Sequence, residues 1–250
     1  MIGSGKEQGA DYKDYAYNQN STSARLEHII LPEGKQLYIG GEAYKGTIEI
    51  QASATAGDKA VLGTYDTTAG TYQFATLTGA GDLLLLGNNT SGTAIFDFTD
   101  SSAYSGTVYM TANGGAVQVN AHGTGWQNTV IDFTRSADFS NSKIDTTGSA
   151  PSSQTLRLTS DATVKGLRNG ASGYAHVSTG SGIYTLTLGV DGEDYTYTGG
   201  LQDDSSNGVL SLTKIGDNTQ VFAQNATLGS IKVQEGALVF NGNLGAGRLV

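Results

Sequence analysis

Short runs of alternating apolar and polar residues, separated by glycine or asparagine, follow one another from Lys35 onward. In the run AIFDFT, Phe96 and Phe98 share one face of an extended strand and Asp97 takes the other, because successive side chains alternate in a strand. Other short apolar runs bounded by turn residues, several of them alternating, are QLYIGG, GTIEIQA, AVLGTY, YQFATLTG, DLLLLG, GTVYMTA and AVQVNA. So many short runs bounded by turn residues predict an all-β fold.

The segment before these runs has a different pattern. Residues 1–22 are polar and have no periodicity, which is typical of a loosely docked terminus. In SARLEHII, Ser23 precedes an apolar stripe of Leu26, Ile29 and Ile30, and this spacing predicts a short helix that Pro32 would end. We therefore expect residues 1–34 to form an N-terminal extension with one short helix.

Two stretches of the chain are repeated. FDFTDSSAYSG at 96–106 returns as IDFTRSADFSN at 131–141, and LTGAGD at 77–82 returns as LTKIGD at 212–217. The first pair is identical at Asp97/Asp132, Phe98/Phe133, Thr99/Thr134, Ser101/Ser136 and Ser105/Ser140. A single unit of this size cannot bury its own apolar face, whereas stacked copies cover one another. The repeats therefore predict a stack of small β units.

The stretch TTGSAPSSQ at 146–154 is typical of a linker, because it gathers small polar residues around a proline. We expect two β-rich lobes on either side of it, residues 35–148 and residues 155–250. The sequence pattern of the two lobes is compatible with stacked β units and with two β-sandwich domains.

The C-terminal third carries a recognisable pattern, VLSLTKIGDNTQVFAQNATLGSIKVQEGALVFNG at 209–242. It has a Leu-Thr-Lys-x-Gly opening, a short strand, an asparagine turn, and then Gly-x-hydrophobic-x-Val-x-x-Gly-x-Leu. This pattern resembles the autotransporter-associated β-strand repeat, and residues 77–110 match it more loosely, without the lysine and with Gly106 as the later glycine. The matching positions are Leu212, Thr213, Lys214, Gly216, Asn225, Gly229, Val233, Gly236 and Leu238.

The resemblance implies a surface or secreted passenger region of a Gram-negative bacterium. Such regions are usually right-handed β-solenoids, so we expect an all-β, irregular right-handed β-solenoid-like stack, with two β-sandwich domains as the alternative. In that family the repeats assist folding during export and have no catalysis of their own. The predicted protein is a non-enzymatic spacer, or an adhesin towards host glycans or glycoproteins. It would need no cofactor, and it would lie outside the cell or on the outer-membrane surface, with its export signal not in this chain.

The charge and composition of the chain limit which classes of binding partner and which kinds of site are possible. The net charge is −9, charged residues make up only 15% of the chain, and there are no cysteines, so disulfides and thiolate metal sites are excluded. No apolar run approaches the ~20 residues of a membrane helix. A nucleic-acid binder needs a concentrated basic face, so the acidic balance of the chain disfavours nucleic acid as a partner. The mildly basic zone at residues 135–168 keeps polymer binding, nucleic acid included, as a second alternative, whose candidate residues are Arg135, Lys143, Arg157, Lys165 and Arg168.

Paired aspartates support a hydrolase as the first alternative, acting on mucin-type glycoprotein or polysaccharide. Asp97 and Asp132 would project outward side by side if the repeated units stack, and two close carboxylates can cleave a glycosidic bond. Asp66 in DTTAG and Asp145 in DTTGS resemble the Asp-Thr-Gly loops of aspartic peptidases, with one extra residue before each glycine. The competing interpretations are a solvated strand face and Asx-type turns.

Two further groups of residues are candidates for binding. Trp126, with His122 four residues before it, would suit a sugar ring if it were exposed on a loop, and would otherwise cap a core. Asp203 and Asn207 lie in DDSSNG, which resembles the start of a calcium loop. Lys214 stands where such a loop needs a bidentate glutamate, so we expect at most a weak surface Ca²⁺ site and no dedicated metal centre.

Overall fold

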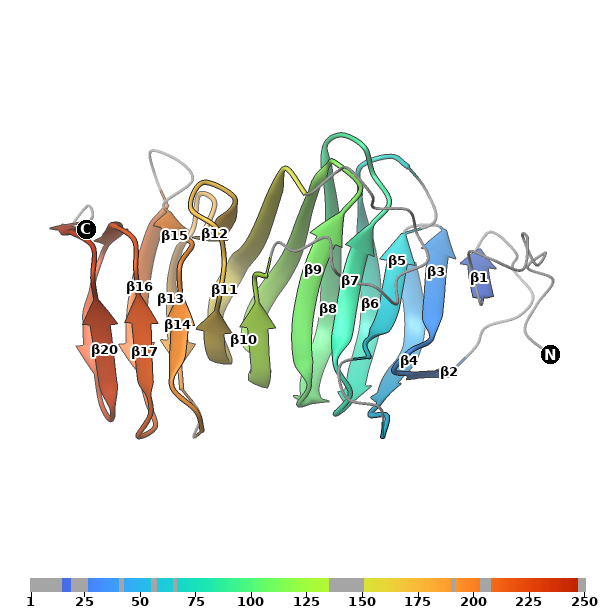
Figure 1. The fold of residues 1–250 in the computed structure, drawn as a ribbon, viewed down its shortest axis with the longest axis horizontal. Helices are drawn as coiled ribbons and strands as arrows, with labels where there is room; N and C mark the ends of the chain where they lie inside the picture. The colour runs from blue at the N-terminus through green and yellow to red at the C-terminus, as the bar shows by residue number, and fades with distance from the viewer. Residues whose placement is uncertain are drawn as a thin grey trace. The chain divides into compact units, whose positions relative to one another are not determined.

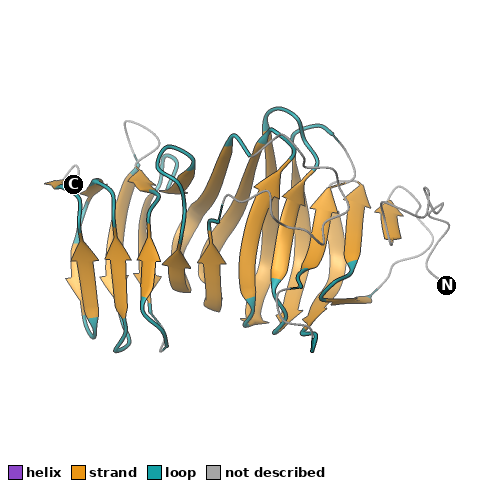
Figure 2. Cartoon of the chain, viewed as in Figure 1, coloured by secondary structure: helices purple, strands orange, loops and turns teal. Residues whose placement is uncertain are grey.

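The computed structural model describes residues 15–18, 27–40, 43–54, 58–64, 67–134, 151–189, 192–202 and 208–246. This part of the chain forms strands, turns and bends, without a helix, and its strand ladders are parallel (Figure 2). The prediction of an all-β fold is therefore confirmed.

The described residues form two compact units. The first comprises the residues up to 118 together with 151–152, and the second comprises 119–134 together with 153–246. The strand β10 (Ala116–Asp132) begins in the first unit and continues in the second. Residues 119–134 thus belong with the C-terminal unit, whereas the linker prediction placed them in the N-terminal lobe.

The first unit is built from two parallel ladders, in which each strand pairs with the second strand after it along the chain (Figure 1). One ladder contains β1 (Tyr15–Asn18), β3 (Gln36–Gly40), β5 (Ala60–Thr64), β7 (Leu83–Gly87) and β9 (Thr107–Ala112). The other contains β2 (His28–Pro32), β4 (Ala43–Gln51), β6 (Gly70–Gly79) and β8 (Thr93–Tyr104). We use the word layer for the stretch of chain that begins at one strand of a ladder and ends just before the next strand of the same ladder.

The second unit has three parallel ladders. The first runs through β11 (Ser153–Arg168), β13 (Ile183–Leu188), β16 (Val209–Lys214) and β19 (Ile231–Val233). The second runs from β11 through β12 (Ala175–Ser178), β15 (Gly200–Gln202), β18 (Ala226–Leu228) and β21 (Leu244–Ala246). The third contains β14 (Tyr195–Tyr197), β17 (Thr219–Phe222) and β20 (Ala237–Phe240).

The helix predicted over Ser23–Ile30 is wrong for the part that the structure describes, because His28–Pro32 is the strand β2. Ile29 pairs with Ile48 and Leu31 with Ile50 of β4, so the segment follows the two-residue period of a strand. Burying these side chains against a neighbouring strand outweighs the weak local preference for a helix. Residues 23–26 lie outside the described residues.

Aromatic side chains stack along the ladders and form much of each core. In the first unit the rings of Phe74 and Phe98 are 4.7 Å apart between centroids, and Phe96 and Phe98 are fully buried. In the second unit Phe133 lies 5.0 Å from Tyr197, and Phe222 lies 5.2 Å from Phe240. The inward aromatic positions of the repeated stretch thus bury their rings against the next layer, as the strand pattern predicts.

Burial disfavours the ionised form of two tyrosines, Tyr104 in the first unit and Tyr197 in the second. The Tyr104 hydroxyl lies 2.7 Å from the Gly81 carbonyl oxygen, and the Tyr197 hydroxyl lies 3.2 Å from that of Gly200. Burial raises the pKa of Tyr104 well above its usual value, helped by the charge of Asp82, and burial alone does the same for the pKa of Tyr197. Folding therefore opposes ionisation of both phenols.

We expect the protein to lose stability above about pH 10 for this reason. Both folded-state pKa values are raised, so the stabilisation is complete below the unfolded pKa of about 10 and is lost as pH rises above it. Each tyrosine should remove about 1.4 kcal/mol of unfolding free energy per pH unit. The loss is measured as the urea concentration at the midpoint of unfolding at about pH 8, 10 and 11. In the Tyr197→Phe variant, the midpoint of the second unit should fall less steeply as the pH rises. A midpoint that does not fall above pH 10 would contradict the assignment.

Candidate functional site

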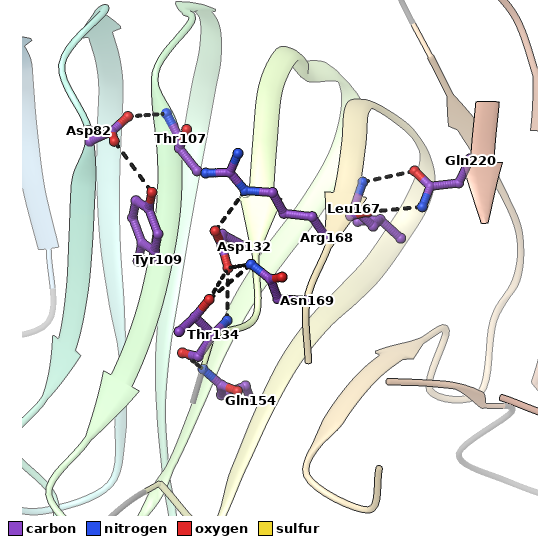
Figure 3. Close-up of polar contacts among 10 residues, drawn as sticks. All are labelled: Asp82, Thr107, Tyr109, Asp132, Thr134, Gln154, Leu167, Arg168, Asn169 and Gln220. Atoms are coloured by element: carbon purple, nitrogen blue, oxygen red, sulfur yellow. Dashed lines mark hydrogen bonds and ion pairs between the residues drawn. The ribbon is translucent and has the colours of Figure 1, made fainter. Parts of the chain in front are cut away.

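A polar cluster of the second unit surrounds Asp132, at the end of β10 (Figure 3). Its Oδ2 atom lies 2.7 Å from Nε of Arg168, the last residue of β11. Its Oδ1 atom accepts hydrogen bonds from the Thr134 amide at 2.8 Å, the Thr134 hydroxyl at 2.7 Å and the Asn169 side-chain amide at 2.9 Å. Gln154 then donates to the Thr134 carbonyl at 3.2 Å.

These contacts use the acceptor capacity of the carboxylate. An ionised carboxylate has about four acceptor positions, and Asp132 meets four donors while only 2% of the residue is exposed. The cluster also holds Asn169, whose backbone φ is +59°, in the left-handed conformation that asparagine tolerates better than most residues. The arrangement fixes a corner of the chain and surrounds the carboxylate with donors from the protein.

The expectation that Asp132 projects into solvent is therefore wrong. Alternation along the strand points its side chain away from Ile131 and Phe133, but Arg168 and Asn169 follow it by 36 and 37 residues and cover it. Arg168, a candidate for nucleic-acid binding, is committed to this ion pair, and a third of its side chain is exposed. Asp97 is half-buried on β8 beside Gln73 of β6. The pairing of Asp97 with Asp132 stays a prediction.

Trp126 is not a sugar-binding platform. It lies in β10 with 1% of its surface exposed, and its indole N–H donates to the Asn120 carbonyl oxygen at 3.1 Å. A ring must be exposed to stack on a sugar, so the alternative of a Trp packed in a core is confirmed. His122 is half-buried on the same strand.

The remaining candidates divide into described and undescribed residues. Arg157 and Lys165 are half-buried on β11. Arg157 lies in the part of β11 that pairs with β12, and Lys165 follows the part that pairs with β13, so the two cations belong to different ladders. Six candidates lie outside the described residues: Asp66, Asp145, Arg135, Lys143, Asp203 and Asn207. Within the described ranges, no group of three or more histidine or acidic side chains is placed to hold a metal ion.

Acidic side chains at the turns have a structural use that the sequence patterns did not reveal. A carboxylate in one layer accepts a hydrogen bond from a backbone N–H in the next, and this recurs in both units. The contacts are Asp82 to Thr107 at 3.0 Å, Asp161 to Thr185 at 2.7 Å and Asp194 to Thr219 at 2.7 Å. In the first unit, Glu33 likewise accepts from Ser53 at 2.7 Å and from Asp82 at 2.6 Å. The signal that could have found the first three is an aspartate 24 or 25 residues before a strand threonine.

Lys214 fills the interior of a turn in the second unit. Its fully buried ammonium group donates to the carbonyl oxygens of Ile215 and Gly216 and to Oδ1 of Asn218, the last two at 2.7 Å. Burial lowers the pKa of Lys214, and nearby carboxylates, led by Asp217, oppose that shift. Three donors thus meet three acceptors, which is the arrangement of an ammonium cap that stabilises a turn.

Glycines on both sides leave room for this cap. A Cβ atom at Gly189, in the preceding layer, would lie 2.6 Å from Nζ of Lys214, and one at Gly236, in the following layer, 2.9 Å from it. Gly79 occupies the position of Lys214 in the earlier copy of the motif, and a Cβ there would meet the Ile50 carbonyl oxygen at 2.0 Å. The missing lysine in that copy therefore has a steric reason, since the neighbouring strand approaches too closely for any side chain.

Comparisons with known proteins give no relative for this chain. A scan of protein-family models, a search of curated proteins and a search of solved structures each found no match. Within the described ranges, the chain contains no helix with the length and apolar character needed to cross a membrane.

Proposed function

We propose that this chain is a non-enzymatic β-repeat protein of the autotransporter-passenger type, secreted or exposed at the cell surface, that acts as a spacer. Its layers would form an irregular right-handed β-solenoid-like stack. The observation that carries the proposal is that acidic side chains form hydrogen bonds that hold the fold together. The carboxylates of Asp82, Asp161 and Asp194 accept hydrogen bonds between layers. The carboxylate of Asp132, one of the hydrolase candidates, fixes a corner of the chain. Such a stack extends by adding layers, which suits a protein that holds other parts at a distance.

The resemblance to the passenger repeat gains support from the roles of its matched residues. Lys214 caps a turn, Gly236 leaves room for that cap, and Asn225 accepts the Asn243 amide of the next layer at 2.7 Å. The Lys214 cap is made within its own turn, whereas Gly236 and Asn225 act between one layer and the next. A motif with such roles is expected to recur wherever layers of this kind are stacked.

A spacer is favoured over a glycan-binding adhesin by the distribution of aromatic side chains. Sugar rings are commonly held against exposed aromatic faces, and Tyr174, at 38%, is the most exposed of the aromatic residues whose side chains the structure describes. Most other described aromatic rings pack inside the ladders. The described surface therefore lacks the aromatic strip that an adhesin of this kind would use.

A cleavage and binding assay tests the proposal. The purified chain is incubated with a mucin-type glycoprotein between about pH 3 and about pH 7, where paired carboxylates would titrate, alongside Asp66→Ala and Asp145→Ala. We expect no cleavage by any of the three proteins and no retention of the chain on the immobilised glycoprotein. Cleavage with an acidic optimum that either variant loses would establish the hydrolase instead. Retention without cleavage would establish the adhesin.

A further inference from the structure

Arg157 carries a positive charge that no described residue balances. It lies on β11 between Leu156 and Leu158, which are both buried, so alternation places its side chain on the outer face of the strand. Within the described ranges, its guanidinium group takes part in no hydrogen bond or ion pair. A guanidinium group is always charged in proteins and offers five N–H donors. Because Arg157 is half-buried, its charge loses part of its hydration without gaining an acceptor, which favours the binding of an anion.

The neighbouring strand sets the position of this guanidinium group. Arg157 is in register with Ser178, the last residue of β12 (Figure 1). A Cβ atom at Gly180 would lie 2.9 Å from the guanidinium carbon of Arg157, so the group lies directly against the turn that follows β12. The Gly180 amide donates a hydrogen bond to the Ser178 hydroxyl oxygen at 3.1 Å, which fixes that turn. Packing against the backbone therefore holds the cation in place.

A second polar group without a partner lies beside Arg157 on the same face. His176 of β12 is in register with Thr155, two residues before Arg157, so His176 and Arg157 are diagonal neighbours on adjacent strands. Ala175 and Val177 are buried, which places the His176 imidazole on the outer face. Its Nδ1 atom is buried and has no hydrogen-bond partner within the described ranges. Strands about 4.8 Å apart, with about 6.6 Å per two residues, put the two Cα atoms about 8 Å apart, so one small anion can reach both side chains.

The outer face around these two groups lacks acidic side chains in the described part of β11 and β12 where the two strands pair. Asp161, further along β11, is committed to the Thr185 amide of β13 at 2.7 Å. The outward positions are Thr155, Arg157, Thr159, His176 and Ser178. A local excess of positive charge thus lies on a chain whose net charge is −9.

We propose that Arg157 and His176 bind a phosphate monoester. Such an ester is a small dianion with three terminal oxygens, so it can accept two N–H groups of the guanidinium and one of the imidazole at the same time. The acidic remainder of the chain would repel a long polyanion, such as a nucleic acid or an acidic polysaccharide. A small ester concentrates its charge at one point and avoids that repulsion. This binding goes beyond the spacer function and does not depend on it.

A nuclear magnetic resonance titration of the isotope-labelled chain with glycerol phosphate tests the proposal. We expect the side-chain N–H signal of Arg157 and the imidazole signals of His176 to shift together and to saturate. The side-chain signal of Arg168 should stay unchanged, because that residue is paired with Asp132. Inorganic phosphate should give the same shifts, and chloride at equal ionic strength should give none. An Arg157 signal that does not respond, or that responds equally to chloride, would overturn the proposal.

Two variants assign the binding to Arg157. Arg157→Gln should weaken the binding of glycerol phosphate at least about tenfold, since the charge-assisted hydrogen bonds of a guanidinium group account for that much. The matched control is Lys165→Gln, because Lys165 is a half-buried cation on the same strand beside another ladder, and this variant should bind like the unmodified chain. Equal affinity in Arg157→Gln, or an equal loss in the control, would overturn the proposal. If Arg157→Gln does not fold, the signals of the unmodified chain decide the outcome.

Two further probes separate the sources of the phosphate group. Phosphatidylcholine vesicles that contain phosphatidic acid present the monoester at a membrane, and Arg157-dependent binding of these vesicles would assign the site to a lipid headgroup. Binding of glycerol phosphate without binding of the vesicles would assign it to a soluble ester. A single-stranded oligonucleotide without terminal phosphates presents diesters only, and Arg157-dependent binding tighter than that of glycerol phosphate would overturn the proposal in favour of nucleic acid. The glycoprotein assay tests the spacer function separately.

Discussion

Replacing Asp132 by alanine is expected to lower the unfolding free energy of the second unit by about 2–4 kcal/mol. The change removes an ion pair with Arg168 and leaves the donors of Thr134 and Asn169 without their acceptor. Arg168 can recover water because a third of its side chain is exposed, so the loss should fall short of that for a fully buried pair. Urea unfolding followed by circular dichroism measures the difference.

Asp97→Ala is the matched control for this change, because Asp97 is the equivalent residue of the repeated stretch and is half-buried on β8. Its loss should cost under about 1 kcal/mol. Equal losses for the two variants would show that Asp132 has no special structural role. A folded, fully stable Asp132→Ala protein would contradict the assignment outright and restore Asp132 as a candidate for chemistry.

Gly79→Ala is expected to destabilise the first unit by roughly 2–5 kcal/mol, combining left-handed backbone strain with overpacking. The φ angle of Gly79 is +100°, and the new methyl group would lie 2.0 Å from the Ile50 carbonyl oxygen. That oxygen accepts the amides of Ala80 at 3.1 Å and Gly81 at 3.2 Å, so moving it would disturb both hydrogen bonds. Thermal and urea unfolding of the variant measure the loss.

Gly173→Ala separates the two causes. Gly173 also has a positive φ, +79°, but a Cβ there would meet nothing within 4 Å. This variant should show the backbone strain alone, about 1–2 kcal/mol. If Gly79→Ala costs no more than Gly173→Ala, the close approach of the neighbouring strand at Gly79 does not constrain the fold.

Some of this structure could be predicted from the sequence, because strand patterns are local. Phe96 and Phe98 alternate with Asp97, and that period alone identifies the buried face of β8. The same reasoning failed at His28–Pro32, where pairing with Ile48 and Ile50 decides the outcome and an isolated segment does not reveal its partner.

The polar sites were harder to predict, because their side chains are held by partners that lie far away in the sequence. Alternation indicates that Asp132 points away from the aromatic core, but it gives no information about Arg168 and Asn169, which follow by 36 and 37 residues. The burial of Trp126 likewise depends on packing that a glycine-rich sequence context does not reveal. The sequence identifies Lys214 as a motif position, but the cap depends on how the turn folds Ile215, Gly216 and Asn218 around the ammonium group.

Excision of one layer tests most directly that the second unit is a stack of interchangeable layers. Ile183 is in register with Val209, so deleting residues 183–208 joins Gly182 to Val209 without changing the ladder position. We expect this protein to fold cooperatively, with parallel β-structure and lower stability, because each layer contacts mainly its neighbours. The control deletes residues 195–208, a partial layer that shifts the register, and should not fold. If the whole-layer deletion folds no better than the partial one, the layers are not interchangeable, and the proposal of a stacked spacer would fail.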